Sequence, residues 1–293
     1  MADADAEKVR QLRELLPATS AGIYLDTATR GPIPAETAAA MREAEDWELR
    51  VGRVWDGRED DVAQRSDEAR AVIAAMIGAD PDDVALTFGR EDSLALAAQA
   101  VGGDGKIIDA TYRVGVERLD VNGAGAHAIA FAADRWLLGP EGTGALWLAD
   151  RRAATSNRML PRTSLIGLAR SVGWLEMFVG IEWIYERTEY LAQRLHTTLS
   201  ATPGVDVLTP PDTIGAIVSF RITNWSSAQA VEELSRRVHS LVGQKPDLHA
   251  IVASVAWFNT EDELDRFAQS VMELAAHTPD TLPRRPSLIV LSD

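Results

Sequence analysis

Amines and thiols, the side chains best suited to covalent catalysis, are scarce in this chain of 293 residues. There is no cysteine, which removes thiolate nucleophiles, cysteine zinc sites and iron–sulfur ligation. Of the 29 lysine and arginine side chains, only Lys8, Lys106 and Lys245 are lysines. Arginine does not replace them as a nucleophile, because a guanidinium stays protonated at physiological pH. Carboxylates, phenols and guanidinium groups remain, and these support acid–base catalysis and anion binding.

Several such groups follow predicted strands in the first half of the chain. Apolar runs bounded by turn residues predict strands at 84–88, 107–109, 128–131 and 145–148. Asp109 ends the second of these and Tyr112 follows it, whereas Asp134 and Arg135 follow the third. Helices predicted at 34–44, 62–77 and 92–101 alternate with the strands. This alternation is typical of an α/β fold with a mostly parallel sheet.

The rest of the chain has a different pattern. A helix and a short strand are predicted near the N-terminus, at 5–16 and 23–25. After a long amphipathic helix over 163–201, the pattern predicts strands at 217–222 and 251–258 and helices at 226–242 and 260–276. We therefore expect an N-terminal arm (1–33), a large α/β domain (34–170), a small α+β domain (171–277) and a tail (278–293). The tail ends in an apolar run that is expected to pair as a strand with a sheet edge or a partner chain.

Composition limits the possible partners and location. The formal net charge is −15, and so acidic a surface repels nucleic acid, which is bound through basic contacts to phosphate. The first residues have neither the positive start nor the apolar core of a signal peptide. No run of about 18 apolar residues predicts a membrane span. With cysteine absent, the chain suits a reducing compartment, and we expect a cytoplasmic protein.

Four stretches carry a resemblance to a known family: YLDTATRGPIPAETAAAMREA, ARAVIAAMIGADPDDVALTF, WLLGPEGTG and FNTEDELDRF. They resemble the class V aminotransferases of fold type I, which include the cysteine desulfurases and use pyridoxal phosphate. The resemblance runs in order along nearly the whole chain. It implies a shortened fold-type-I large domain with a mostly parallel sheet and a small C-terminal α+β domain.

The resemblance also assigns roles to individual positions. In the family a serine–glycine–histidine–lysine–tryptophan run carries the lysine that forms the Schiff base. Here the matching run is 132–136, so Arg135 stands in place of the lysine and Asp134 in place of the histidine. Asp109 matches the family's partner of the pyridinium nitrogen, and Tyr112 replaces a nearby glutamine or histidine. Lys106 lies at the start of the strand that Asp109 ends, about 10 Å away, and is a poor substitute amine.

The expected phosphate site is altered as well. Family members place small hydroxyl residues where this chain has Gly89-Arg90-Glu91-Asp92, so two carboxylates stand where a phosphate would bind. Arg162 matches a threonine that the partner subunit supplies. Between Val101 and Ile107 about 60 residues of the family, of the order of two βαβ units, are missing. These losses predict that pyridoxal phosphate is lost, leaving no cofactor and no metal.

The resulting expectation is a cofactor-independent isomerase, lyase or cyclase acting on a small anionic metabolite in bacterial specialised metabolism. Its catalytic residues would be Asp109, Tyr112, Asp134 and Arg135, and its substrate-binding residues Arg30, Arg90, Trp136 and Arg162. In a purely structural alternative, Arg135 pairs with Asp109 and fills the cleft, while Trp136 belongs to the core or a dimer interface. Two functional alternatives remain, a non-catalytic pseudoenzyme or partner of an active paralogue, and a pyridoxal-phosphate-dependent enzyme. The resemblance implies a homodimer.

Overall fold

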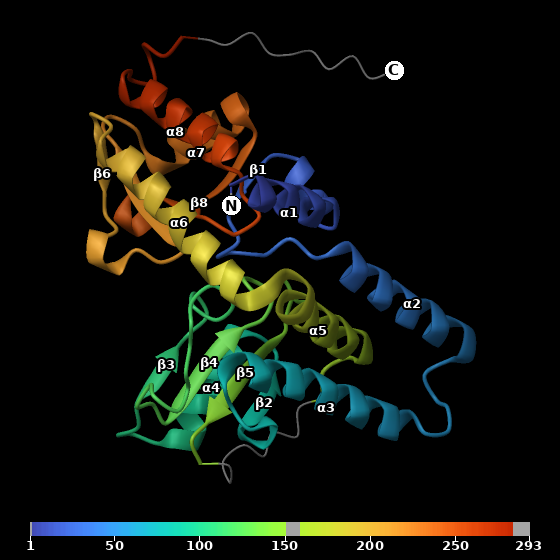
Figure 1. Ribbon diagram of the computed structural model, residues 1–293. Helices are drawn as coiled ribbons and strands as arrows, with labels where there is room; N and C mark the ends of the chain where they lie inside the picture. The colour runs from blue at the N-terminus through green and yellow to red at the C-terminus, as the bar shows by residue number, and fades with distance from the viewer. Residues whose placement is uncertain (1, 151–158, 284–293) are drawn as a thin grey trace.

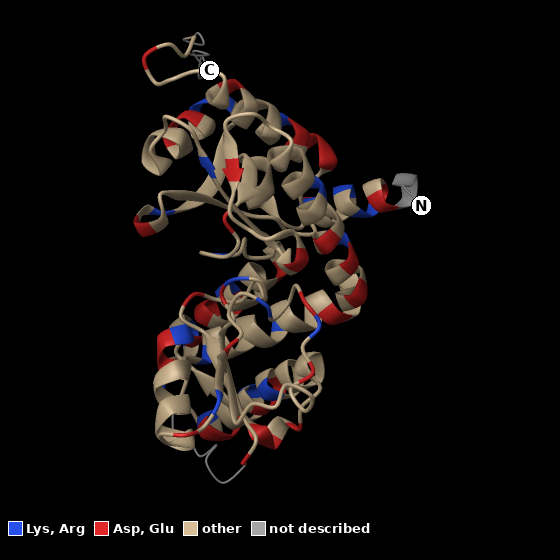
Figure 2. Cartoon of the chain, turned by 90° about the vertical axis from the view of Figure 1, so that its left-hand side faces the viewer, with Lys and Arg blue, Asp and Glu red and all other residues tan. Residues whose placement is uncertain are grey.

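The chain folds into two lobes, each built around its own sheet (Figure 1). The computed structural model describes residues 2–150 and 159–283, with side chains from residue 5 on. A long helical segment, coloured yellow in Figure 1, runs from one lobe to the other. Acidic and basic residues are scattered along both lobes (Figure 2).

The first lobe contains a four-stranded sheet. Its strands are β2 (Val84–Thr87), β3 (Ile107–Asp109), β4 (Ala128–Ala132) and β5 (Gly144–Leu148), in the order β2-β5-β4-β3. β3 pairs parallel with β4, whereas β5 runs antiparallel to both of its neighbours, β2 and β4. Three of the four strands therefore run in one direction. Their carboxyl ends meet at one edge of the sheet, where ligands bind in open α/β folds.

The two faces of this sheet pack against different helices, as the alternating side chains of β4 show. Ile129 and Phe131 belong to the main core together with residues of α3 and α5, whereas Ala128 and Ala130 pack with α4. The helices of this lobe are α2 (Ala35–Val51), α3 (Arg58–Ile77), α4 (Arg90–Val101) and α5 (Arg162–Trp174).

The second lobe contains a five-stranded sheet in the order β1-β8-β9-β7-β6. The strands are β1 (Ile23–Leu25), β6 (Val205–Val207), β7 (Ile217–Ile222), β8 (Ser240–Lys245) and β9 (Ala250–Ser254). The helices are α1 (Ala2–Glu14), α6 (Ile181–Ser200), α7 (Ser227–Val238) and α8 (Glu261–Ala275). Although β1 comes from the N-terminal arm, it pairs parallel with β8. The arm thus leads from this sheet directly to α2 of the first lobe.

Two predicted helices in the second half of the chain need correction, and the strand expected at 251–258 is observed as Ala250–Ser254. The helix expected over 163–201 is interrupted by a π-helical turn over Leu175–Gly180, which ends where Gly180 takes a φ of +91°. The helix expected over 226–242 stops at Val238, because His239 turns into the left-handed region and β8 begins at Ser240. In addition, β6 was not predicted, since its sequence Val-Asp-Val forms no continuous apolar run.

The fold class is confirmed: the chain is a mixed α/β protein with a larger α/β part and a C-terminal α+β part. The segment Arg162–Ser200 is long and apolar enough to cross a membrane, but 44% of its most apolar window is buried inside the protein. Core helices of globular proteins pass the same test of length and composition. The domain boundaries at 33, 170 and 277 stay a prediction, and the strand expected at the end of the tail lies outside the described residues.

Candidate functional site

Asp109 and Arg90 form an ion pair at the carboxyl edge of the first sheet. Arg90 is the first residue of α4, which follows β2, and its Nη2 lies 2.5 Å from Oδ2 of Asp109. The Thr111 N–H donates to the other carboxylate oxygen over 3.1 Å. Burial raises the pKa of Asp109, but the hydrogen bonds from Thr111 and Arg90 outweigh it and leave the pKa below its usual value. Asp109 is therefore held ionised.

Arg135 contacts Tyr112 rather than Asp109. Its guanidinium carbon lies 5.0 Å from the centre of the Tyr112 ring, which is a cation–π contact. The Arg135 Nε is buried and has no hydrogen-bond partner within the described chain. The predicted alternative in which Arg135 neutralises Asp109 is therefore wrong, because Arg90 already occupies that carboxylate. Tyr112 is 39% exposed, so this pair borders solvent.

Asp134 faces the N-terminal arm. Its side chain is buried, with Oδ2 accepting from the Gly142 N–H over 3.3 Å and lying 3.6 Å from Nε of Arg30. Arg30 also pairs with Glu141 over 3.1 Å. The other oxygen of Asp134, Oδ1, has no hydrogen-bond partner among the described residues. Glu141 was not predicted as a site residue, because its GPEGTG segment has the pattern of a tight turn.

Gly31 lets the arm approach the Asp134–Arg135 segment closely. Its N–H donates to the Asp134 carbonyl over 3.0 Å. A Cβ at this position would lie 2.0 Å from the carbonyl oxygen of Arg135, which no side chain tolerates. The arm thus places Arg30 beside Asp134 through a backbone contact that requires glycine.

Two of the predicted substrate-binding residues have partners elsewhere. Arg162 starts α5 and pairs with Asp61 of α3 over 2.5 Å, and its guanidinium carbon lies 5.2 Å from the Trp47 ring centre. Trp136 is 2% exposed and packs in the main core. The structure therefore brings together Asp109 with Arg90, Tyr112 with Arg135, and Asp134 with Arg30, and it gives Arg162 and Trp136 separate surroundings.

Side-chain carboxylates of Glu91 and Asp92 stabilise the turn between β2 and α4. The Asp92 side chain accepts from the Phe88 N–H over 3.0 Å, and Glu91 lies 3.4 Å from Arg90. Both acids stand in the first turn of α4. Negative groups stabilise a helix start, and here the chain itself supplies them.

Comparisons with known proteins point to one fold. No family model matches the sequence. The chain is 23% identical over 211 residues to a probable cysteine desulfurase of Methanothermobacter thermautotrophicus, covering 58% of this chain and 52% of that protein. The chain thus spans about half the length of the curated relative it matches.

Solved structures agree over more of the chain. A mutant of the protein C-DES, with glycine covalently linked to its PLP cofactor, superposes with a TM-score of 0.76 at 14% identity, covering 89% of this chain and 98% of that one. The apo cysteine desulfurase of Thermococcus onnurineus gives 0.74 at 15% identity, covering 91% and 98%. The cysteine desulfurase CsdA of Escherichia coli gives 0.72 at 16% identity, covering 90% and 97%.

These findings contradict the prediction that the chain has no cofactor. The structure of C-DES is described with its PLP cofactor, and the curated relative is a probable cysteine desulfurase. The comparisons therefore point to pyridoxal phosphate. The prediction of its loss relied on substitutions at individual positions and on the segment missing between Val101 and Ile107.

Asp109 suits the ring of such a cofactor, whereas Glu91 and Asp92 stand at the helix start where its phosphate would bind. Asp109 is ionised at the edge where the strands end, and a carboxylate that already accepts two partners still has lone pairs for a ring N–H. None of the three lysines offers an amine there. Lys106 Nζ donates to the Ala124 carbonyl, Lys8 lies over the Trp183 ring, and Lys245 ends β8.

The sequence resemblance and the superpositions therefore lead to the same conclusion. Both recover strands and helices in the order expected for the large and small parts of a fold-type-I enzyme. The chain has the fold of the cysteine desulfurases and class V aminotransferases.

Proposed function

We propose that the chain is a pyridoxal-phosphate-dependent enzyme of the class V aminotransferase type that holds its cofactor without a lysine link and acts on a small anionic metabolite. The observation that carries the proposal is Asp109, an ionised carboxylate at the end of β3, in a fold shared with C-DES, which is described with a PLP cofactor. When bound, the cofactor supplies an electron sink for reactions at a substrate carbon.

The surrounding side chains suit an anionic substrate. Arg135 forms no ion pair among the described residues, and guanidinium binds carboxylates in a planar, two-pronged manner. Arg30 lies near the same edge but is paired with Asp134 and Glu141, which a substrate carboxylate would have to replace. Tyr112, half-exposed beside Arg135, carries the hydroxyl that would donate to the substrate or move a proton. Asp109 would accept from the pyridinium nitrogen and keep it protonated.

A titration with pyridoxamine phosphate tests non-covalent binding. This compound carries an amine where pyridoxal phosphate carries an aldehyde, so it forms no Schiff base with a surface lysine. We expect saturable binding by calorimetry, weakened about tenfold or more in D109N, because the hydrogen bond lost is to a charged acceptor. The matched control D104N removes the same charge from the exposed loop 102–106 and should bind as the parent protein does.

Two results would overturn the proposal: no saturable binding of pyridoxamine phosphate, or equal binding by D109N and D104N. Borohydride reduction after addition of pyridoxal phosphate provides a further check. Reduction would attach the cofactor covalently to any lysine that had formed a Schiff base with it. Because no lysine lies near Asp109, we expect the mass added to the parent protein and to D109N to be the same.

A second candidate function is a non-catalytic partner of an active paralogue. The Arg90–Asp109 ion pair favours this second function. Asp109, the residue expected to bind the cofactor's ring nitrogen, is already neutralised by Arg90, so the site is stable without a ligand. A protein of this kind would copurify with the paralogue and show no pyridoxamine phosphate binding of its own. The homodimer and the cytoplasmic location predicted from the sequence remain part of the first proposal.

A further inference from the structure

An apolar groove of about 420 Å³, the α5 groove, lies on the first lobe where α5 packs against both α2 and α3 (Figure 1). It continues onto the π-helical turn that follows α5. Its apolar lining consists of Val72 of α3, Ile166 and Trp174 of α5, and Met177 and Phe178 of the turn. None of the predicted site residues lines it, so the groove is separate from the Asp109 cleft.

Two large apolar side chains beside the α5 groove project into solvent. Met177 is 88% exposed and Phe178 is 61% exposed, whereas Leu175 and Val179 of the same turn are buried. Phe178 stacks on Trp174 with ring centres 6.2 Å apart, so the exposed ring extends the apolar surface of the groove. Large apolar side chains that stand in solvent next to an apolar groove mark an interaction surface.

The charged residues around the α5 groove indicate what kind of partner fits it. Two acids, Glu36 and Glu68, and two bases, Arg65 and Arg170, line it, so the charge of the groove balances although the whole chain carries −15. Arg65 pairs with Glu68 over 2.8 Å. Glu36 and Arg170 are exposed, and neither forms an ion pair within the described chain. Two acidic molecules repel each other least at a neutral surface, and this surface offers each of them one free acid and one free base.

We propose that the α5 groove is the contact surface between two copies of this chain related by a two-fold axis. Both copies present the same residues in a two-fold interface, so Glu36 would meet Arg170 of the partner subunit, and the reverse contact would form by symmetry. Met177 stands beside the groove and would fill the groove of the other copy. The inference rests on the homodimer of the proposed function and names the surface through which it forms.

Sedimentation equilibrium over a range of protein concentrations tests the surface. We expect a dimer for the parent protein and a dissociation constant at least about tenfold higher for M177E, because a charge then enters an apolar groove. The matched control M272E places the same charge at an exposed methionine of α8 and should dimerise as the parent protein does. Met177 is exposed in the single chain, so M177E is expected to fold, which circular dichroism checks.

Charge reversal tests which residues meet in the dimer. E36R and R170E should each weaken dimerisation by about tenfold, because like charges then face each other in both symmetry-related contacts. The double variant E36R/R170E restores opposite charges, and its dissociation constant should return to within about threefold of the parent value. Rescue of this kind requires the two residues to be in contact across the interface.

Several results would overturn the proposal. A monomeric parent protein excludes the dimer, and binding of that monomer to phosphatidylcholine vesicles would assign the groove to a membrane instead. Equal dimerisation by M177E and M272E would place the contact on another face. A double variant no stronger than E36R and R170E would contradict the two-fold pairing. By contrast, a dimer that binds no pyridoxamine phosphate would contradict the cofactor proposal alone.

Discussion

Asp109 keeps its charge because Arg90 reaches it from a different element. The two residues lie on β3 and α4, and Nη2 and Nε of Arg90 approach the same carboxylate oxygen at 2.5 and 2.7 Å. Both side chains are partly exposed, which limits the energy of the pair through solvent screening. The pair therefore acts mainly on ionisation and position, and less on overall stability.

We predict that Arg90→Gln raises the pKa of Asp109 and lowers the free energy of unfolding by up to about 1 kcal/mol near neutral pH. A lowered carboxyl pKa stabilises the fold above the unfolded-state pKa, and this contribution is lost as the pH falls through the folded-state pKa. The difference between variant and parent should therefore shrink at about pH 3.

Urea denaturation at the two pH values measures this difference. Arg42→Gln, at an exposed position on α2, is the matched control and should change stability little at either pH. A loss of stability in Arg90→Gln that stays the same at acid and neutral pH would contradict the prediction.

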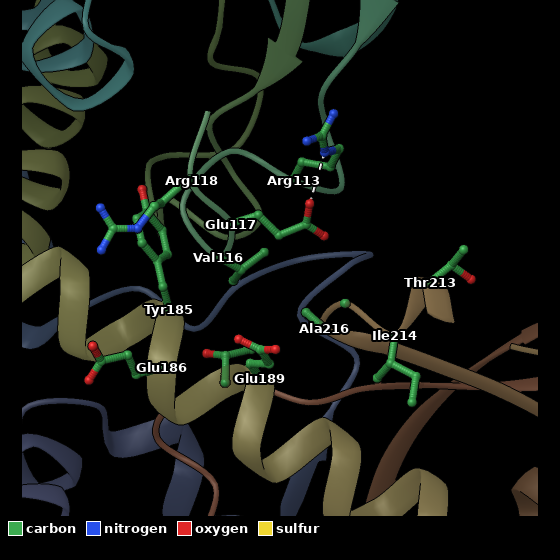
Figure 3. A pocket seen from close by; sticks show the side chains of 12 residues that line it. Arg113, Val116, Glu117, Arg118, Tyr185, Glu186, Glu189, Thr213, Ile214 and Ala216 are labelled. Atoms are coloured by element: carbon green, nitrogen blue, oxygen red, sulfur yellow. Dashed lines mark hydrogen bonds and ion pairs between the residues drawn. The ribbon is translucent and has the colours of Figure 1, made fainter. Parts of the chain in front are cut away.

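At the scale of elements, the π-helical turn between α5 and α6 sets where the polypeptide passes from one lobe to the other. The turn covers Leu175–Gly180 and carries the buried Leu175 and Val179. Gly180 closes it at a φ of +91°, a conformation that side chains with a Cβ avoid. The direction of α6 depends on this glycine. The same helix forms one wall of the inter-lobe cavity, which is also lined by residues of the segments 113–118 and 213–216 (Figure 3).

Gly173 and Gly180 provide a matched pair of tests. Gly180→Ala should destabilise the protein and Gly173→Ala should not. Alanine at 180 would be strained by about 1–2 kcal/mol. Gly173 lies inside α5, where an added Cβ meets nothing within 4 Å. Alanine there should stabilise by about 0.5–1 kcal/mol through helix propensity. Thermal unfolding of both variants checks the opposite signs, and equal shifts would contradict the role given to Gly180.

At the scale of the whole molecule, a buried arginine links α6 to the segment that follows β9. Arg187 donates to the carbonyls of Trp257 and Asn259 over 2.8 and 3.0 Å, and it pairs with Glu261 over 3.3 Å. Trp257 packs in turn against Trp174 and Trp183, with ring centres 5.9 and 6.0 Å apart. Hydrogen bonds and aromatic packing thus meet where the two lobes join.

We predict that Arg187→Met lowers the free energy of unfolding by about 2–4 kcal/mol, because it leaves two buried carbonyls without donors. Chemical denaturation followed by tryptophan fluorescence measures the loss and reports on the same junction. Arg194→Met on the exposed face of α6, where Arg194 pairs with Asp265, should cost less than about 1 kcal/mol. Equal losses in the two variants would contradict a special role for the buried residue.

Local patterns predicted most elements well. The strands expected at 23–25, 107–109 and 217–222 match the observed bounds, because each is an apolar run between turn residues. β8 was missed because its residues continue the amphipathic pattern of α7, and only the left-handed turn at His239 separates them. The turn at His239 is favoured because β8 then pairs with β1 and β9. The periodicity of the local sequence carries no information about that pairing.

The sequence by itself determined which functional groups exist: no cysteine, three lysines, and arginine at position 135. It also determined that Asp109 ends a strand. Only the tertiary structure decided which cation holds that carboxylate. Arg90 and Asp109 are 19 residues apart on elements that meet because of the strand order β2-β5-β4-β3. The inter-lobe cavity is likewise a product of the fold, because its walls come from segments about 70 to 100 residues apart whose approach depends on how the lobes pack.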